Sequence, residues 1–113
     1  MTEASATVYA FGPYQLRAAQ RALLRDDRPV VLTPKGFDTL LFLIQHRDRV
    51  VTKDELLREI WSDVVVEEGN LTQQIFLLRK ALQESADGQQ YIATIPRVGY
   101  RFVANVAASQ QSD

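Results

Sequence analysis

The stretch that decides the fold runs from residue 69 to residue 103 and reads GNLTQQIFLLRKALQESADGQQYIATIPRVGYRFV. Its first half places leucine or isoleucine every three or four residues, which predicts a helix over 69–84 with one buried stripe. Its second half predicts two strands, 91–95 and 100–103, joined by a tight loop that carries Arg97. The stretch therefore predicts a helix packed on one side and followed by a β-hairpin. The buried stripe consists of Leu71, Ile75, Leu78 and Leu82.

Two more helices are predicted upstream of this stretch. Thr33 is a good N-cap and Pro34 suits the first helical position, so a helix is expected over 34–46. The tetrad TKDE at 52–55 is a capping box, in which a threonine hydroxyl and a glutamate carboxylate each satisfy a backbone N–H. It predicts a helix over 53–61.

The N-terminal part, residues 7–32, reads as short β segments separated by turn residues. Its apolar positions lie close to period two, and two prolines interrupt any longer period. This pattern predicts a small antiparallel meander. Residues 1–6 and 106–113 are small and polar without periodicity, so we expect an N-terminal tail and a C-terminal tail or the start of a linker. A single domain is expected over 7–105.

Composition limits the function classes. The chain has 113 residues, of which 46% are hydrophobic and 24% charged, as expected of one soluble globular domain. It has no cysteine and one histidine, which excludes disulfides and thiolate metal sites and argues against zinc. No apolar stretch approaches the length of a membrane span, and the acidic start is unlike a signal peptide, so a cytoplasmic location is expected.

The charge distribution points to one end of the chain. The formal net charge is −1, so an anionic partner has to be bound by a local patch. Cations gather in the C-terminal part, at Arg79, Lys80, Arg97 and Arg101. No phosphate-binding loop, nucleophile elbow or zinc-protease motif occurs, so we expect no enzyme, no cofactor, no metal and no small-molecule substrate.

The predicted parts suit duplex DNA. An α-helix fits the major groove, and a narrow hairpin tip that carries an arginine fits the minor groove. Gln73 and Gln74 carry the donor and acceptor that an adenine edge requires, and Phe76 or Leu77 suits a thymine methyl group. Exposed apolar residues on a helix also suit a protein partner. The alternative is therefore a protein-interaction module that docks through this helix and the acidic connection over 62–69.

Four short motifs occur in order along the chain: LTPK at 32–35, RVVT at 49–52, LRKAL at 78–82 and GYRF at 99–102. With them, the sequence resembles the winged-helix effector domain of OmpR/PhoB-type transcription regulators over residues 8–104. The segments NLTQQ at 70–74 and IPRVGY at 95–100 are more similar to the CadC/ToxR-like branch.

The resemblance implies an α+β fold: a winged helix-turn-helix with an N-terminal four-stranded antiparallel sheet, three helices and a C-terminal β-hairpin wing. It implies sequence-specific binding of double-stranded DNA for transcription regulation, with helix 69–84 in the major groove and wing 91–103 at the minor groove. It also implies contact of the 62–69 connection with RNA polymerase. The chain would be the effector module of a longer signal-responsive regulator, whose sensor is a phosphorelay receiver, a periplasmic domain or a repeat domain.

By position, the resemblance assigns site residues of two kinds. Base reading falls to Thr72, Gln73, Gln74, Phe76 and Leu77. Contacts with the DNA backbone or minor groove fall to Trp61, Arg79, Lys80, Thr94, Arg97 and Tyr100, and the charge of Arg101 adds a phosphate contact. From the residues alone, Trp61 also fits the core, and Arg79 also fits a partner carboxylate. The sequence departs from the family at Phe76 or Leu77, where a cation is common, and at Gly36, where glutamate is common.

Overall fold

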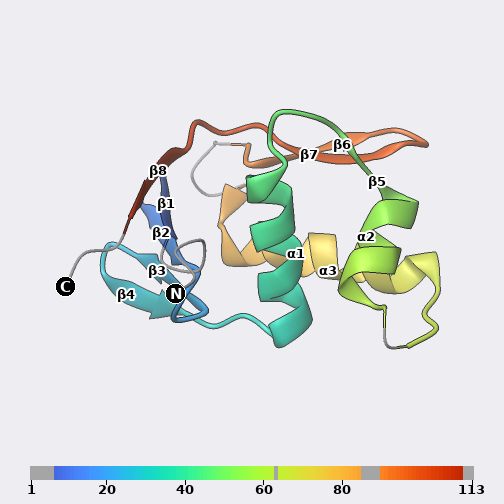
Figure 1. The fold of residues 1–113 in the computed structure, drawn as a ribbon, viewed down its shortest axis with the longest axis horizontal. Coiled ribbons are helices and arrows are strands. Elements are labelled where there is room, and N and C mark those ends of the chain that lie inside the picture. The colour runs from blue at the N-terminus through green and yellow to red at the C-terminus, as the bar shows by residue number, and fades with distance from the viewer. Residues whose placement is uncertain (1–6, 63, 85–89, 111–113) are drawn as a thin grey trace.

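The computed structural model describes residues 7–62, 64–84 and 90–110, which form two antiparallel sheets and three helices (Figure 1). The five-stranded sheet lies at one end of the molecule and α2 at the other, with α1 between them. The predicted α+β class is confirmed. The first sheet contains β1 (Thr7–Phe11), β2 (Tyr14–Arg17), β3 (Ala22–Arg25), β4 (Arg28–Val30) and β8 (Ala107–Gln110).

The first sheet has one strand more than predicted. Its order is β4-β3-β2-β1-β8, and β8 pairs antiparallel with β1 from Ala107 opposite Ala10 to Gln110 opposite Thr7. The expectation of a tail over 106–113 is therefore wrong for residues 107–110. The physical reason is that β8 is exposed on both faces, so its pairing rests on backbone hydrogen bonds, which leave no hydrophobic alternation in the sequence.

Two of the helices begin where the sequence predicts, and the third begins one residue earlier. The three helices are α1 (Pro34–Gln45), α2 (Lys53–Ile60) and α3 (Glu68–Ala81). The Thr33 hydroxyl accepts a hydrogen bond from the Gly36 N–H at 3.0 Å, and the Thr52 hydroxyl accepts one from the Glu55 N–H at 3.1 Å. Both threonines thus act as N-caps. The helix ends differ from the predicted ones by one to three residues.

The wing belongs to the second sheet. Its strands are β5 (Val51–Thr52), β6 (Ile92–Ile95) and β7 (Gly99–Phe102), in the order β5-β7-β6. The predicted hairpin is confirmed as β6–β7. The short extended segment before α2 supplies β5, which pairs with β7. Strand β7 of the wing is therefore hydrogen-bonded to the segment that leads into α2.

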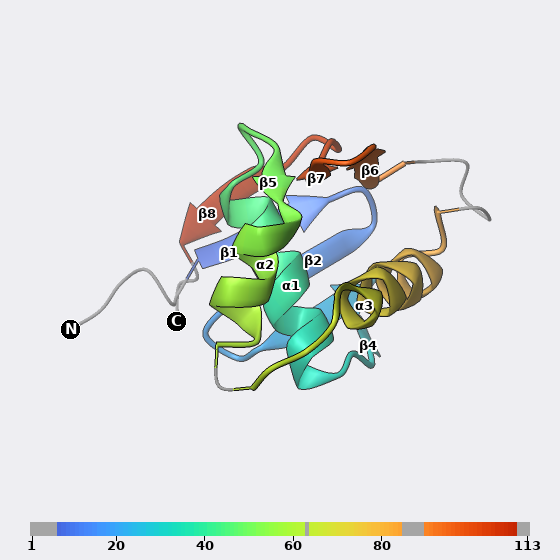
Figure 2. The same cartoon turned by 90° about the vertical axis from the view of Figure 1, so that its right-hand side faces the viewer.

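A common core joins these layers. Phe11 of the first sheet packs against Phe102 of the wing with ring centroids 5.1 Å apart, and against Tyr91 at 5.8 Å. Leu71 and Ile75 of α3 are fully buried in the same core. With the view turned by 90°, α3 lies along one side of α1 and the wing sheet along another (Figure 2). Across the described ranges, no helix is long and apolar enough to cross a membrane.

Candidate nucleic-acid interface

The α3 helix has a buried face and an outer face. Leu71, Ile75 and Leu78 are buried. With 3.6 residues per turn, the opposite side of the helix carries residues that are all exposed. We call this set the outer face of α3. It consists of Thr72, Gln73, Phe76, Leu77 and Lys80.

The Gln74 side chain does not share this face. It is half-buried on the flank of α3 that meets α1, where the Thr33 hydroxyl donates to Gln74 Oε1 at 3.5 Å. A Cβ built on Gly36 would lie 3.1 Å from the same oxygen. The structure therefore brings together four of the five predicted base-reading residues and places Gln74 beside them, against the first turn of α1.

Phe76 and Lys80 contact each other along the outer face. The Lys80 ammonium lies over the Phe76 ring, 5.4 Å from its centroid. Such a cation–π contact is favourable and orders both side chains. The outer face thus carries an ammonium group at its C-terminal end and an amide, from Gln73, one turn N-terminal to the ring.

Arg97 lies at the tip of the wing, between β6 and β7. The turn is closed by the Val98 N–H, which donates to the Ile95 carbonyl at 3.0 Å, and Arg97 has a positive φ of 68°. The Val98 carbonyl in turn accepts from the Lys53 N–H at 3.1 Å, so the tip is bonded to the start of α2. The Arg97 side chain is exposed.

Arg79 and Thr94 join α3 to the wing. One guanidinium nitrogen of Arg79 donates to Thr94 Oγ1 at 2.7 Å and to the Ile92 carbonyl at 2.9 Å. The Glu84 carboxylate lies 3.7 Å from Arg79 Nε and accepts from the N–H groups of Tyr91, at 3.0 Å, and Ile92, at 2.9 Å. We call Arg79, Glu84 and Thr94 the wing bracket.

The wing bracket changes how two predicted contact residues are understood. The alternative that Arg79 pairs with a carboxylate is confirmed, and Thr94 is its hydrogen-bond acceptor. Glu84 was missed as a site residue, because its partners are backbone groups seven and eight residues later in the chain. Glu84 is a single glutamate near the end of a helix, and no motif in the sequence marks it.

Three further predicted residues lie away from the outer face. Trp61 and Tyr100 are buried in the core. Arg101 is exposed between buried Tyr100 and Phe102, so it points to the opposite face of the wing sheet. Its Nε donates to the Arg47 carbonyl at 3.3 Å.

Near the start of α3, Lys53 is held in an ion pair. Lys53 Nζ lies 2.7 Å from a Glu68 carboxylate oxygen, and this hydrogen bond raises the pKa of Lys53. In the part of the chain that the structure describes, no ion pair involves Lys80 or Arg97. Lys80 and Arg97 therefore offer positive charge to a partner, at the end of the outer face and at the wing tip.

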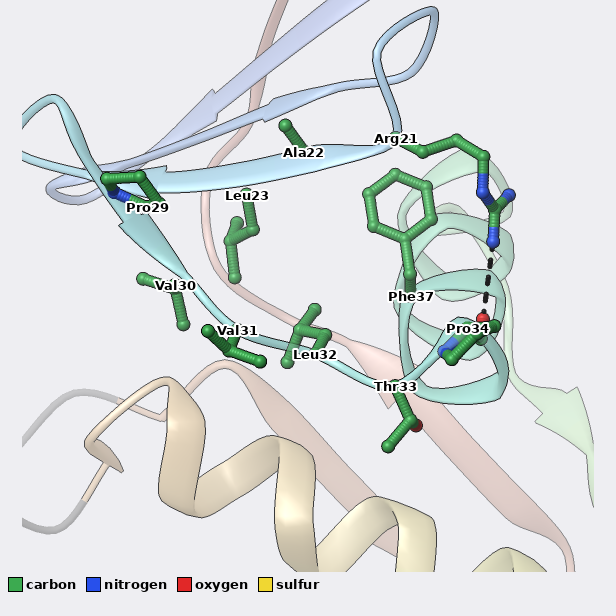
Figure 3. A pocket seen from close by; sticks show the side chains of 10 residues that line it. All are labelled: Arg21, Ala22, Leu23, Pro29, Val30, Val31, Leu32, Thr33, Pro34 and Phe37. Carbon is green, nitrogen blue, oxygen red and sulfur yellow. Dashed lines mark hydrogen bonds between the residues drawn. The ribbon is translucent and has the colours of Figure 1, made fainter.

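A cavity of about 330 Å³ lies apart from these groups, between β3, β4 and the start of α1 (Figure 3). Its charged residue, Arg21, is held by Asp38 at 2.8 Å and by the Pro34 carbonyl at 3.4 Å, and it stacks on Phe37 at 4.8 Å. The rest of the lining is mainly apolar. This cavity therefore offers no unsatisfied charge to a ligand.

Comparisons with known proteins place the chain in a family. Residues 27–102 match the family described as "Transcriptional regulatory protein, C terminal". The chain belongs to this family. It is 33% identical over 100 residues to the transcriptional activator CadC of Escherichia coli K12. The matched residues make up 88% of this chain and 20% of CadC. It is 37% identical over 81 residues to the transcriptional regulator HilA of Salmonella typhi, covering 72% and 14%. The chain thus spans a fifth or less of these relatives.

Solved structures agree with this placement. The DNA-binding domain of E. coli CadC superposes with a TM-score of 0.79 and 32% identity, covering 88% of this chain and 94% of that one. The DNA-binding domain of Klebsiella pneumoniae RstA, solved in complex with the RstA box, has a TM-score of 0.71 and 26% identity, covering 84% and 95%. The predicted resemblance and the winged-helix fold are confirmed.

Proposed function

We propose that this chain binds double-stranded DNA sequence-specifically, as the DNA-binding module of a longer transcription regulator. The α3 helix enters the major groove and the β6–β7 wing contacts the minor groove. The observation that carries the proposal is the outer face of α3, an exposed row with an amide and an ammonium group, beside a hairpin tipped by Arg97. The similar domains of CadC and RstA are described as DNA-binding.

Each exposed group has a role in this proposal. Thr72 and Gln73 offer hydrogen bonds to base edges, which carry sequence information. Lys80 and Arg97 contact phosphates or the minor groove, which positions the protein on the duplex. The wing bracket fixes the wing relative to α3, so that both elements meet adjacent grooves without rearrangement. The role is non-catalytic, in keeping with a family of transcriptional regulatory proteins.

The first test is the salt dependence of duplex binding. The chain is titrated into a fluorescently labelled 24-base-pair duplex of random sequence, and anisotropy is measured at about 50 and 200 mM salt. With about four phosphates neutralised, the slope of log K against log salt is near −3.6, a loss of about a hundredfold over that range. Absence of binding at the lower salt concentration contradicts the proposal.

Single substitutions locate the interface. Arg97→Ala and Lys80→Ala are each expected to weaken binding and to reduce the salt slope by about one. Arg28→Ala is the matched control, because Arg28 is an exposed cation on the N-terminal sheet. All three chains should have the circular dichroism of the parent. Equal affinity of the parent and both interface variants would contradict the proposed surface.

A second contact is proposed for the connection between α2 and α3. Val64 and Val65 are 51% and 103% exposed, beside a surface cavity of about 350 Å³ that Leu57 and Trp61 line. Exposed aliphatic residues of this kind suit a protein partner, and the family resemblance suggests RNA polymerase. Val65→Asp should weaken the binding of RNA polymerase to the chain on duplex DNA, measured in a gel-shift assay, and leave duplex affinity unchanged. Unchanged binding of RNA polymerase by this variant would exclude the contact.

A further inference from the structure

The middle of the outer face of α3 is apolar. Phe76 is 54% exposed and Leu77 is 40% exposed. They follow Gln73 by three and four residues, so they lie directly next to it on the helix surface. Two large apolar side chains thus occupy the middle of the face that the proposed function places in the major groove.

Polar groups flank this apolar pair at both ends. Gln73 lies one turn before it, and Lys80 lies one turn after it with its ammonium over the Phe76 ring. From Gln73 to Lys80 the helix advances about 10 Å at 1.5 Å per residue, which equals about three base-pair steps. The order amide, apolar pair, ammonium therefore matches a short run of bases with a phosphate at one end.

The chemistry of the major groove identifies what the apolar pair can contact. Guanine and adenine present polar edges there, and cytosine presents an amino group, whereas thymine presents a methyl group. Arginine or lysine at these positions would favour guanine, and this chain has neither at 76 or 77.

We propose that Phe76 and Leu77 are specificity-determining residues that bind thymine methyl groups. The ligand is then a duplex with A·T pairs, thymine on the contacted strand, at the centre of the site that α3 reads. This inference rests on the proposed DNA binding and adds the class of base to it. The nearby ammonium of Lys80 favours a polyanion over an apolar protein surface as the occupant of this face.

Removal of the methyl group alone tests the proposal. The affinity of the chain is measured at about 50 mM salt for a 24-base-pair A·T duplex and for the same duplex with deoxyuridine in place of every thymidine. The two differ only by methyl groups, which lie in the major groove. We expect uridine to lower the affinity about fourfold for each methyl contacted, the factor for burying one CH₂ group. A G·C duplex should conversely gain affinity when its cytosines carry a 5-methyl group.

Variants assign the effect to the apolar pair. Phe76→Ala and Leu77→Ala should each reduce the preference for thymine over uracil, and the double variant should abolish it. Both side chains are largely exposed, so the fold is expected to persist. Val103→Ala is the matched control, since Val103 is 45% exposed at the end of β7, away from the outer face, and its loss should keep the full preference.

The outcomes separate this inference from the function on which it rests. Equal affinity for the two A·T duplexes, with a steep salt dependence retained, overturns methyl reading and leaves DNA binding intact. A thymine preference that survives in the double variant also overturns it. If no duplex binds, both proposals fail, and the apolar pair is then a surface for a protein partner.

Discussion

The two flanks of α3 are held in different ways. The flank toward the wing is fixed by the wing bracket, in which Arg79 donates to Thr94 and Glu84 accepts from two backbone N–H groups, at donor–acceptor distances of 2.7 to 3.0 Å. The flank toward α1 rests on packing around Gly36 and Leu78, with one long contact from Thr33 to Gln74 and a cavity of about 190 Å³ nearby. The contact of α3 with the wing thus depends on a few polar atoms, whereas its contact with α1 depends on shape.

The largest effect is expected where the wing meets β5. Gly99 is buried, and a Cβ there would collide with the Val51 carbonyl oxygen and lie 2.8 Å from Thr52 Cα. These neighbours are backbone atoms of a paired strand, which side-chain rotation does not relieve. Gly99→Ala should therefore lower the free energy of unfolding by about 3 kcal/mol or more. The measurement is urea-induced unfolding followed by circular dichroism. A loss below about 1 kcal/mol would show that β5 and β7 separate easily.

The next largest effect should come from removal of the Glu84 carboxylate. Glu84→Ala leaves the N–H groups of Tyr91 and Ile92 without their acceptor and removes the ion pair of Arg79. The expected loss is about 2 kcal/mol of unfolding free energy, because buried unpaired donors are costly. Duplex affinity should fall while the salt slope stays constant, since no phosphate contact is removed.

Glu84→Gln is the matched control for the wing bracket. It keeps an oxygen acceptor for the two N–H groups and removes only the charge. It should therefore lose less stability and less duplex affinity than Glu84→Ala. If both variants bind DNA as tightly as the parent, the wing bracket does not position the wing.

The difference between local and long-range interactions explains which elements the sequence could predict. Helices α1 and α2 follow from capping residues, and the hairpin follows from β-branched and aromatic residues around a tight turn, because these signals are local. Strand β8 reads AASQ, which has no alternation of apolar and polar residues, so its pairing with β1 could not be predicted.

The candidate site shows the same limit. The outer face of α3 was predictable from helical spacing, but the half-burial of Gln74 was not. Thr72 and Gln74 lie about 100° to either side of Gln73 on the helix, and α1 packs only against the flank that carries Gln74. The wing bracket depends on where Glu84 meets the backbone of β6, and no spacing of side chains encodes that meeting. Local patterns therefore predict which residues a helix exposes, and tertiary structure decides which of them stay available.

A smaller, pH-dependent effect is expected from the ion pair of Arg49 and Glu55, next to β5 and the start of α2. Glu55 accepts two hydrogen bonds from Arg49, at 2.8 and 2.7 Å, and these lower the pKa of Glu55. Because the folded pKa lies below the unfolded value of about 4.3, the pair contributes its full stability above that pH and loses it as the pH falls toward the folded pKa. The pair lies at the surface, so its effect should be smaller than that of Glu84→Ala.

Glu55→Gln tests this effect, because it removes the charge but keeps the N–H that Thr52 caps. The urea midpoint of the parent should fall more steeply below about pH 4.3 than that of the variant, and the two curves should converge in acid. Curves that stay parallel from pH 7 to about pH 3 would mean that the ion pair contributes no stability to the β5–α2 corner.

The smallest effect is expected on the α1 flank, at Gly36. A Cβ there would lie 3.0 Å from Thr33 Oγ1 and 3.1 Å from Gln74 Oε1, which is close, but the Gln74 amide can move. Alanine is about 1 kcal/mol better than glycine inside a helix, and this gain opposes the tight contact. Gly36→Ala should therefore change the free energy of unfolding by less than about 0.5 kcal/mol, far from the loss at Gly99. If Gln74 limits the fit, Gly36→Ala should be more stabilising in a Gln74→Ala background, which a double-mutant cycle measures. A loss of about 2 kcal/mol in both backgrounds would instead show that the α1 flank is as unyielding as the strand pairing beneath the wing.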